Sequence, residues 1–167
     1  MILLHLIVEY KITNFVYVDE CGINKHFQRE FGRAKRGVKI QDTKRGKKLK
    51  RTNIIGGLWY DGLQHRHVAM KTYCHSTNSE FFEDWFEYEL IAVIPEGSVI
   101  IMDNASFHRK SILREIAKRH GVILVFLPPY SPDFNPIEKS WANFKRWLRT
   151  NSKRFKNLFW AVATYFY

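Results

Sequence analysis

Residues 98–127, SVIIMDNASFHRKSILREIAKRHGVILVFL, decide the expected fold because two kinds of pattern alternate in them. Residues 98–102 and 122–127 are continuous apolar runs, which are typical of strands in a sheet covered on both faces. Residues 109–120 between them have a helical apolar face made of Ile112, Leu113, Ile116 and Ala117. Gly121 is a typical helix stop. A strand, a helix and a second strand are therefore expected.

Upstream of this unit, three β-rich runs and one helical pattern are expected. The runs are residues 15–20, 53–60 and 64–72, and Asp61-Gly62 between the last two is a hairpin turn signal. Thr77 and Glu80 have the spacing of a capping box at a helix start. The apolar stripe of that helix consists of Phe82, Trp85, Phe86 and Leu90.

Downstream, the Pro-rich loop at residues 128–136 (PPYSPDFNP) leads into another helix. Asn135 is expected to cap this helix, with Pro136 at its first position. Its apolar stripe consists of Ile137, Trp141, Phe144 and Leu148, and a last short helix is expected over residues 157–163. The complete order fits an α/β, ribonuclease-H-like fold, in which helices flank a mixed five-stranded sheet. The pattern alone leaves other α/β arrangements open.

The composition favours a polyanionic partner. The chain has 167 residues with 27 Lys and Arg against 16 Asp and Glu, a net charge of +11. This length fits one domain, and 46% hydrophobic residues exclude a disordered tail. The longest apolar runs are too short to cross a bilayer, so nucleic acid is the expected partner and no membrane is. Cys21 and Cys74 have no metal-binding spacing, which indicates a reduced, cytoplasmic protein.

Three acidic residues stand at the ends of buried elements. Asp19 ends the first strand, Asp103 follows residues 98–102, and Glu138 lies in the first turn of a helix. In open α/β sheets, functional sites gather at the carboxyl ends of the strands. Three carboxylates there would repel one another unless a divalent cation joined them, and hard oxygen ligands suit Mg²⁺ or Mn²⁺. Two such ions hold the attacking and leaving oxygens of a phosphoryl displacement.

Purely structural roles remain open for the same acids. Asp19 would cap a turn, and Asp103 would form an Asx turn with Asn104. Glu138 lies three residues after Asn135 and would complete a capping box.

Three stretches resemble the catalytic domain of mariner-like DDE transposases, in their bacterial insertion-sequence branch. They are VDECG at residues 18–22, IIMDNASFH at residues 100–108 and LPPYSPDFNPIEKSW at residues 127–141. The third stretch is the most specific, because a long and unusual Pro-rich loop leads into a helix. The 34 residues between Asp103 and Glu138 are the spacing that this resemblance expects.

The resemblance implies that residues 1–14 are a short lead-in and residues 15–167 a ribonuclease-H-like DDE catalytic domain. It implies that Asp19, Asp103 and Glu138 are catalytic and bind two Mg²⁺ or Mn²⁺ ions. Water would cleave DNA at transposon ends, and the freed 3′-hydroxyl would attack target DNA at a TA dinucleotide. A homodimer on DNA, in the cytoplasm and at the bacterial nucleoid, is also implied.

Three further residues in these motifs are auxiliary candidates. Asn104 and His108 closely follow Asp103. His108 would contact the scissile phosphate or a metal-bound water, or else cap a helix or pack in the core. Asn135 is expected to act as a cap rather than as a ligand.

Two runs of cations, residues 33–51 and 139–156, flank the acidic positions in the sequence. The candidate DNA contacts are Arg33, Lys35, Arg36, Lys44, Arg45, Lys47, Lys48 and Arg51 in the first run, with Lys145 and Arg149 in the second. Each run is either a solvated face or one wall of a DNA channel. Phosphate contacts of this kind position a duplex without reading its sequence.

The resembling transposases carry an N-terminal helix-turn-helix region that recognises transposon ends. Only fourteen residues precede Phe15, too few for that motif, so we expect a separate or missing recognition module. The chain would then be a fragment, a split-frame product or a decayed copy. Two alternatives stay open: a stand-alone ribonuclease-H-like nuclease without strand transfer, and an inactive remnant that only binds DNA.

Overall fold

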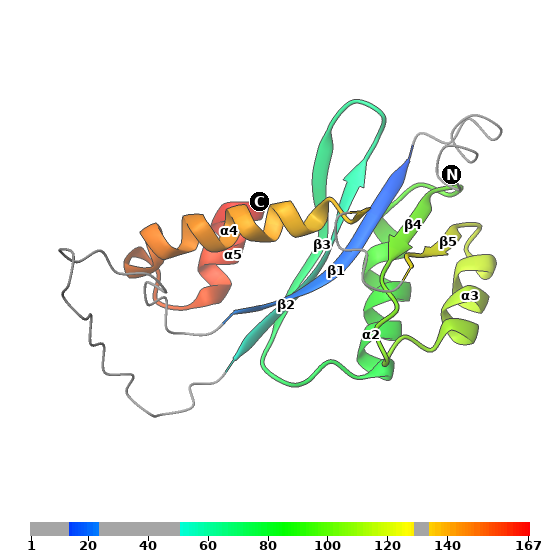
Figure 1. Ribbon diagram of the computed structural model, residues 1–167, viewed down its shortest axis with the longest axis horizontal. Helices are drawn as coiled ribbons and strands as arrows, with labels where there is room; N and C mark the ends of the chain where they lie inside the picture. The colour runs from blue at the N-terminus through cyan, green and yellow to red at the C-terminus, as the bar shows by residue number, and fades with distance from the viewer. Residues whose placement is uncertain (1–13, 24–50, 129–133) are drawn as a thin grey trace, which may run out of the picture.

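The computed structural model of the protein describes residues 14–23, 51–128 and 134–167. A five-stranded sheet with the order β3-β2-β1-β4-β5 forms its centre (Figure 1). The strands are β1 (Phe15–Ile23), β2 (Thr52–Tyr60), β3 (His65–Tyr73), β4 (Val99–Met102) and β5 (Ile123–Phe126). β1, β2 and β3 pair antiparallel, whereas β4 is parallel to both β1 and β5. The predicted mixed five-stranded sheet is confirmed.

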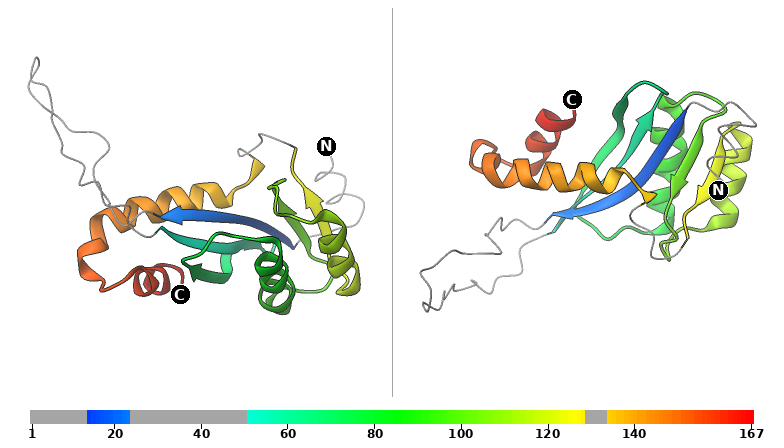
Figure 2. Two further views of the ribbon diagram at one scale, coloured as in Figure 1. Left: turned by 90° about the horizontal axis from the view of Figure 1, so that it is seen from below. Right: turned by 45° about the horizontal axis from the view of Figure 1, so that its top comes forward.

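Helices cover both faces of this sheet, as predicted (Figure 2). They are α2 (Ser79–Trp85), continued by the π-turn η1 (Phe86–Leu90) and the 3₁₀ turn η2 (Ile91–Val93), then α3 (Lys110–Arg119), α4 (Ile137–Asn151), the 3₁₀ turn η4 (Ser152–Arg154) and α5 (Leu158–Phe166). Core residues of α2, η1 and α3 form one hydrophobic cluster with the sheet, and those of α4 and α5 form another. Among the described helices, none combines the length and the apolar character needed to cross a membrane.

The alternation of side chains along β1 assigns its residues to these two clusters. Val16 and Val18 pack in the cluster with α2 and α3, whereas Cys21 and Ile23 pack in the cluster with α4 and α5. Successive residues of a strand point to opposite faces. The neighbouring acids at positions 19 and 20 therefore point to opposite faces as well, and only Asp19 points toward α4.

The start of α2 differs from the predicted capping box. Asn78 is the N-cap, and its side chain accepts a hydrogen bond of 2.9 Å from the backbone N–H of Phe81. The Thr77 hydroxyl instead hydrogen bonds the Tyr73 hydroxyl at 2.6 Å. Thr77 is thus held by β3, and the next residue with a suitable side chain caps the helix.

The prediction that Asn135 caps α4 is wrong. Pro136 is the N-cap residue, no side chain caps the helix, and the Asn135 amide donates to the Val18 carbonyl at 3.1 Å. The reason lies in the sheet, because β4 pairs with β1 only as far as Tyr17. The carbonyl of Val18 has no strand partner on that side, and Asn135 supplies the missing donor.

β5 is a strand as predicted, but its expected full burial is wrong. Ile123 is 38% exposed, and the rest of the strand is half-buried. β5 is the last strand of the described sheet, so one of its edges has no neighbour. On α3, Lys110 and Arg114 place their cations 5.3 and 5.5 Å from the Phe126 ring, which covers part of the strand.

Candidate active site

Asp19 is the centre of the candidate site. It lies on β1 opposite Gly56 of β2, and its Oδ2 atom accepts a hydrogen bond of 3.0 Å from the indole N–H of Trp141. Gly56 has no side chain, which leaves room for the Met70 side chain on this face of the sheet. A Cβ atom at Gly56 would clash with the Met70 sulfur, whereas the Trp141 ring would lie at an ordinary contact distance of 3.6 Å. The indole thus passes close to Gly56 on its way to Asp19.

The Asp19 carboxyl is surrounded by other acids in a largely buried position. Its pKa is raised to about 8, first by burial and then by the charges of Glu138, Glu20 and Asp103. These three carboxylates come from α4, β1 and the segment after β4. Their influence on the pKa of Asp19 is consistent with the prediction that the acids gather at the strand ends. Within the described residues, no Lys or Arg forms an ion pair with these carboxylates.

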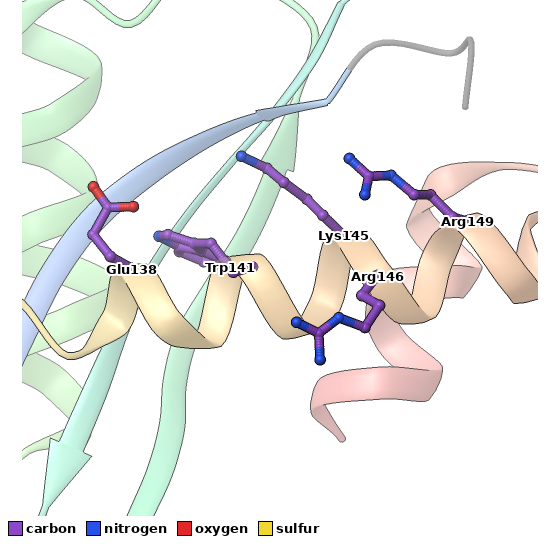
Figure 3. Close-up of a pocket in the computed structure, with 6 residues that line it drawn as sticks. Glu138, Trp141, Lys145, Arg146 and Arg149 are labelled. Carbon is purple, nitrogen blue, oxygen red and sulfur yellow. The ribbon is translucent and has the colours of Figure 1, made fainter. Parts of the chain in front are cut away.

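Glu138 approaches Asp19 from the first turn of α4. Its backbone N–H donates to the Asn135 carbonyl at 3.1 Å, so Glu138 is fixed close to the residue that ties α4 to β1. Figure 3 shows its carboxylate at the start of α4, beside the indole of Trp141. Among the charged groups near Asp19, Glu138 makes the largest contribution to the raised pKa.

Asp103 follows β4 and forms the Asx turn that the sequence left open. Its Oδ1 atom accepts a hydrogen bond of 3.0 Å from the backbone N–H of Ala105. Its side chain is nevertheless 55% exposed, so the carboxylate remains accessible from solvent. The structural role and a ligand role are therefore compatible for Asp103.

Glu20 and His108 form a second, buried part of the site. The His108 side chain is only 2% exposed; its Nε2 atom lies 3.8 Å from Oε1 of Glu20 and its Nδ1 atom 3.4 Å from Oδ1 of Asp103. The ring packs against Phe82 and Phe107. His108 therefore packs against aromatic rings, as one of its three predicted roles has it, and a contact with the phosphate or a metal-bound water stays a prediction. Sequence reasoning assigned no role to Glu20, although strand alternation places it on this face.

The donor chemistry of these acids fits a hard divalent cation. Asp19, Asp103 and Glu138 offer only carboxylate oxygens, and Oε1 of Glu20 is buried without a hydrogen-bond partner in the described part of the chain. Among the described residues, no three His, Cys, Asp or Glu side chains are already grouped closely enough to hold a metal ion. The convergence of the three acids within metal-sharing distance therefore stays a prediction.

Residues 14–158 match the family model described as DDE superfamily endonuclease. The chain belongs to this family. No curated protein matches the chain in sequence.

The solved structures similar to this DDE endonuclease domain include complexes of the Mos1 transposase. The Mos1 paired-end complex with the left transposon end has 21% identity and a TM-score of 0.62, covering 86% of this chain and 45% of that one. The mariner Mos1 paired-end complex with Mn has 20% identity and a TM-score of 0.58, covering 78% and 42%. The Mos1 strand transfer complex has 17% identity and a TM-score of 0.54, covering 83% and 44%.

These similarities confirm the predicted ribonuclease-H-like fold. They also show that the chain spans less than half the length of the Mos1 transposase chains it matches.

The two auxiliary asparagines of this DDE endonuclease domain join loops to strands. The Asn104 amide donates to the Leu127 carbonyl, which ties the segment after β4 to the end of β5. The Asn135 amide donates to Val18 in the same way. Both side-chain oxygens are buried and have no partner among the described residues. The two residues therefore hold the segments that carry Asp103 and Glu138.

The DNA-contact candidates that the structure describes lie near the end of β1 and along α4. Lys145, Arg146 and Arg149 line a cavity of about 300 Å³ with Glu138, Trp141 and Ala142 (Figure 3). The exposed Arg51 places its guanidinium against Gly22, near the end of β1. The remaining DNA-contact candidates, Arg33, Lys35, Arg36, Lys44, Arg45, Lys47 and Lys48, lie outside the described residues.

Proposed function

We propose that this chain is the catalytic domain of a cut-and-paste DNA transposase. It cleaves DNA at transposon ends and joins the freed 3′-hydroxyl to target DNA. The observation that supports this most is the match of residues 14–158 to the DDE superfamily endonuclease family, in a chain with a net charge of +11. The position of Asp19 among three other acids adds to it. The similar Mos1 structures include a paired-end and a strand transfer complex, which adds support by analogy.

Asp19, Asp103 and Glu138 would hold two Mg²⁺ or Mn²⁺ ions. When bound, such ions polarise the phosphate oxygens as Lewis acids. The chain's own residues prepare the site for them. Trp141 fixes Oδ2 of Asp19 by its hydrogen bond, and Asn135 fixes the start of α4 and with it Glu138. Ala105 holds one oxygen of Asp103 and leaves the other for a ligand.

Both proposed reactions are phosphoryl transfers that need no other reactant. In the first, water attacks the scissile phosphorus and the bond to the 3′ oxygen breaks, leaving a 3′-hydroxyl and a 5′-phosphate. In the second, this hydroxyl attacks a phosphodiester of the target, so that one P–O bond forms as another breaks. Positioning and charge stabilisation carry most of such catalysis. The carboxylates of this chain supply the fixed negative charge that the reaction requires around its ions.

The proposed partners follow from the same function. The domain would act as a homodimer on DNA, insert at TA dinucleotides and depend on a helix-turn-helix module for end recognition. Its expected location is the bacterial nucleoid.

The decisive variant is Glu138→Gln, which removes a charge and keeps the side-chain size. We expect it to abolish Mg²⁺-dependent nicking of plasmid DNA while DNA binding survives. Lys118→Gln on α3 is the matched control, because it changes one exposed charge far from the acids and should nick at the wild-type rate. Nicking by Glu138→Gln at near the wild-type rate would refute the assignment.

Two further readouts separate the alternatives. Joining of a 3′-hydroxyl oligonucleotide to a plasmid identifies a transposase, whereas hydrolysis alone would identify a nuclease. Tb³⁺, a hard-cation probe, should luminesce on excitation of Trp141, because this indole lies 3.0 Å from Oδ2 of Asp19. Asp19→Asn should lose that signal, which tests the metal site without any cleavage assay.

A further inference from the structure

Two Arg–Glu ion pairs join α3 to α2 and its continuation η1, which lie on the same face of the sheet (Figure 1). At the start of α3, Nε and Nη2 of Arg109 donate to the two carboxylate oxygens of Glu83 at 2.8 and 2.6 Å. At the other end, Arg119 donates to one oxygen of Glu87 at 2.8 Å. A two-point contact fixes direction as well as distance. The start of α3 is therefore held in a defined orientation against α2.

The Arg109–Glu83 pair differs from an ordinary surface ion pair in its burial. The Glu83 side chain is only 11% exposed, whereas that of Arg109 is half-exposed. A carboxylate in such a position needs a partner, and both of its oxygens find one in Arg109. Exposed pairs contribute little to stability, but a buried charge that loses its partner is costly. The place of Arg109 is therefore dictated by α2.

A closed turn connects the start of α3 to Asp103. The backbone N–H of Ala105 donates to Oδ1 of Asp103, and the backbone N–H of His108 donates to the Ala105 carbonyl, both at 3.0 Å. Nδ1 of His108 also lies 3.2 Å from the Asp103 carbonyl oxygen. On α2, Phe82 places its ring centroid 4.2 Å from that of His108. Phe82 and its neighbour Glu83 thus hold the end of the turn that begins at Asp103.

We propose that Arg109 is a positioning residue for Asp103, and that its contact with Glu83 sets the affinity of the site for Mg²⁺. This proposal rests on the proposed DNA-cleaving function, because it needs Asp103 to be a metal ligand. Arg109 acts through its neighbours, since two of its donors are occupied by Glu83. Mg²⁺ requires nearly ideal placement of its ligands, so a small displacement of Asp103 should weaken binding.

The test variant removes the ion pair without leaving a buried charge. Arg109→Met/Glu83→Leu replaces both partners by apolar side chains, an exchange that often leaves stability unchanged. The two-point contact that orients the turn is lost all the same. Arg119→Met/Glu87→Leu is the matched control, because it removes the ion pair between the same two elements at the end of α3 remote from Asp103.

The first experiment measures metal binding alone, without DNA. Mn²⁺ is the probe, its free ion is counted by electron paramagnetic resonance, and Mg²⁺ affinity is obtained by displacement. The test variant should bind Mg²⁺ about 10-fold or more weakly than the wild type, the size of effect typical of residues that support metal ligands, and the control should not. Equal Mg²⁺ affinities for the wild type and the test variant would overturn the proposal. A wild type that binds no Mg²⁺ would overturn the proposed function as well.

The second experiment separates positioning from a merely structural role. The Mg²⁺ concentration that gives half-maximal nicking of plasmid DNA should rise about 10-fold or more in the test variant, while the rate at saturating Mg²⁺ is largely kept. A structural role would instead lower the rate at every Mg²⁺ concentration, in proportion to the unfolded fraction in urea titrations.

Arg109→Lys provides a variant that keeps the positive charge beside Glu83. Lys offers a point charge in place of the planar fork, so the fold should survive while the orientation of the turn is lost. We expect the same direction of change in the Mg²⁺ dependence. A lower maximal rate without any change in the Mg²⁺ dependence of Arg109→Lys would overturn the proposal and leave the cleavage function intact.

Discussion

Replacing Asp19 by Asn should stabilise the protein when no metal is present. The pKa of Asp19 is raised from 3.8 to about 8, so the folded protein holds a proton on this carboxyl at pH values where the unfolded chain has lost it. The stabilisation from this proton is complete below pH 4 and is lost as the pH rises through 8. Asn keeps the shape of the protonated carboxyl and its oxygen for the Trp141 indole, and it never ionises.

The magnitude follows from the size of the shift. One pKa unit corresponds to about 1.36 kcal/mol, so about four units set an upper limit of about 5 kcal/mol. Urea unfolding in EDTA at pH 5 and pH 8.5 measures the difference. Between these pH values, the free energy of unfolding of the wild type should fall by about 2–4 kcal/mol more than that of Asp19→Asn.

Two controls make this test specific. Asp84→Asn on the exposed face of α2 should show the same pH dependence as the wild type. Mg²⁺ at pH 8.5 should raise the stability of the wild type more than that of Asp19→Asn, because the variant lacks one of the three carboxylates proposed to hold the cation. If the free energy of unfolding falls equally for the wild type and for Asp19→Asn between pH 5 and pH 8.5, the idea that ionised Asp19 destabilises the fold is refuted.

Two further predictions concern the supports of α4. Asn135→Ala leaves the Val18 carbonyl without its donor and should lower the free energy of unfolding by about 1–3 kcal/mol, with a loss of nicking activity; a change below about 0.5 kcal/mol in a urea titration would contradict the role of this contact. His67 contacts Ser140 and the Phe166 ring, and burial lowers its pKa, so the unfolded chain binds the proton more strongly. Stability should therefore fall as the pH drops below about 6.5. His67→Gln should reduce this loss of stability at acid pH. An equal fall in the free energy of unfolding below about pH 6.5 in the variant and the wild type would contradict the prediction.

The strand-helix-strand unit was predictable because its signals are local. The apolar runs of β4 and β5 and the helical face of α3 each depend on a few consecutive residues. Positions 19, 103 and 138 were predictable for a related reason, since each stands where a periodic pattern ends. The apolar pattern of β5 carries no information about its neighbouring strands. Its place at the edge of the sheet could therefore not be predicted from the sequence.

The roles of the asparagines depend on tertiary partners and could not be read from spacing. An Asn before a helix can cap that helix or bond elsewhere, and the short β4 decides the outcome for Asn135 by leaving the Val18 carbonyl open. At α2 the outcome is the reverse, because Tyr73 engages Thr77 and Asn78 becomes the cap. The place of Glu20 beside His108 could have been predicted in part, because the alternation of side chains along β1 puts Glu20 on the face opposite to Asp19.

The register between β1 and β2 decides which of two adjacent acids faces α4 and the candidate site. Asp19 lies opposite Gly56, close to the Trp141 ring, and Glu20 lies opposite Ile55. Moving β1 by one residue would exchange the two acids between the faces of the sheet. Single-residue insertions and deletions in β1 should therefore be far more damaging than substitutions.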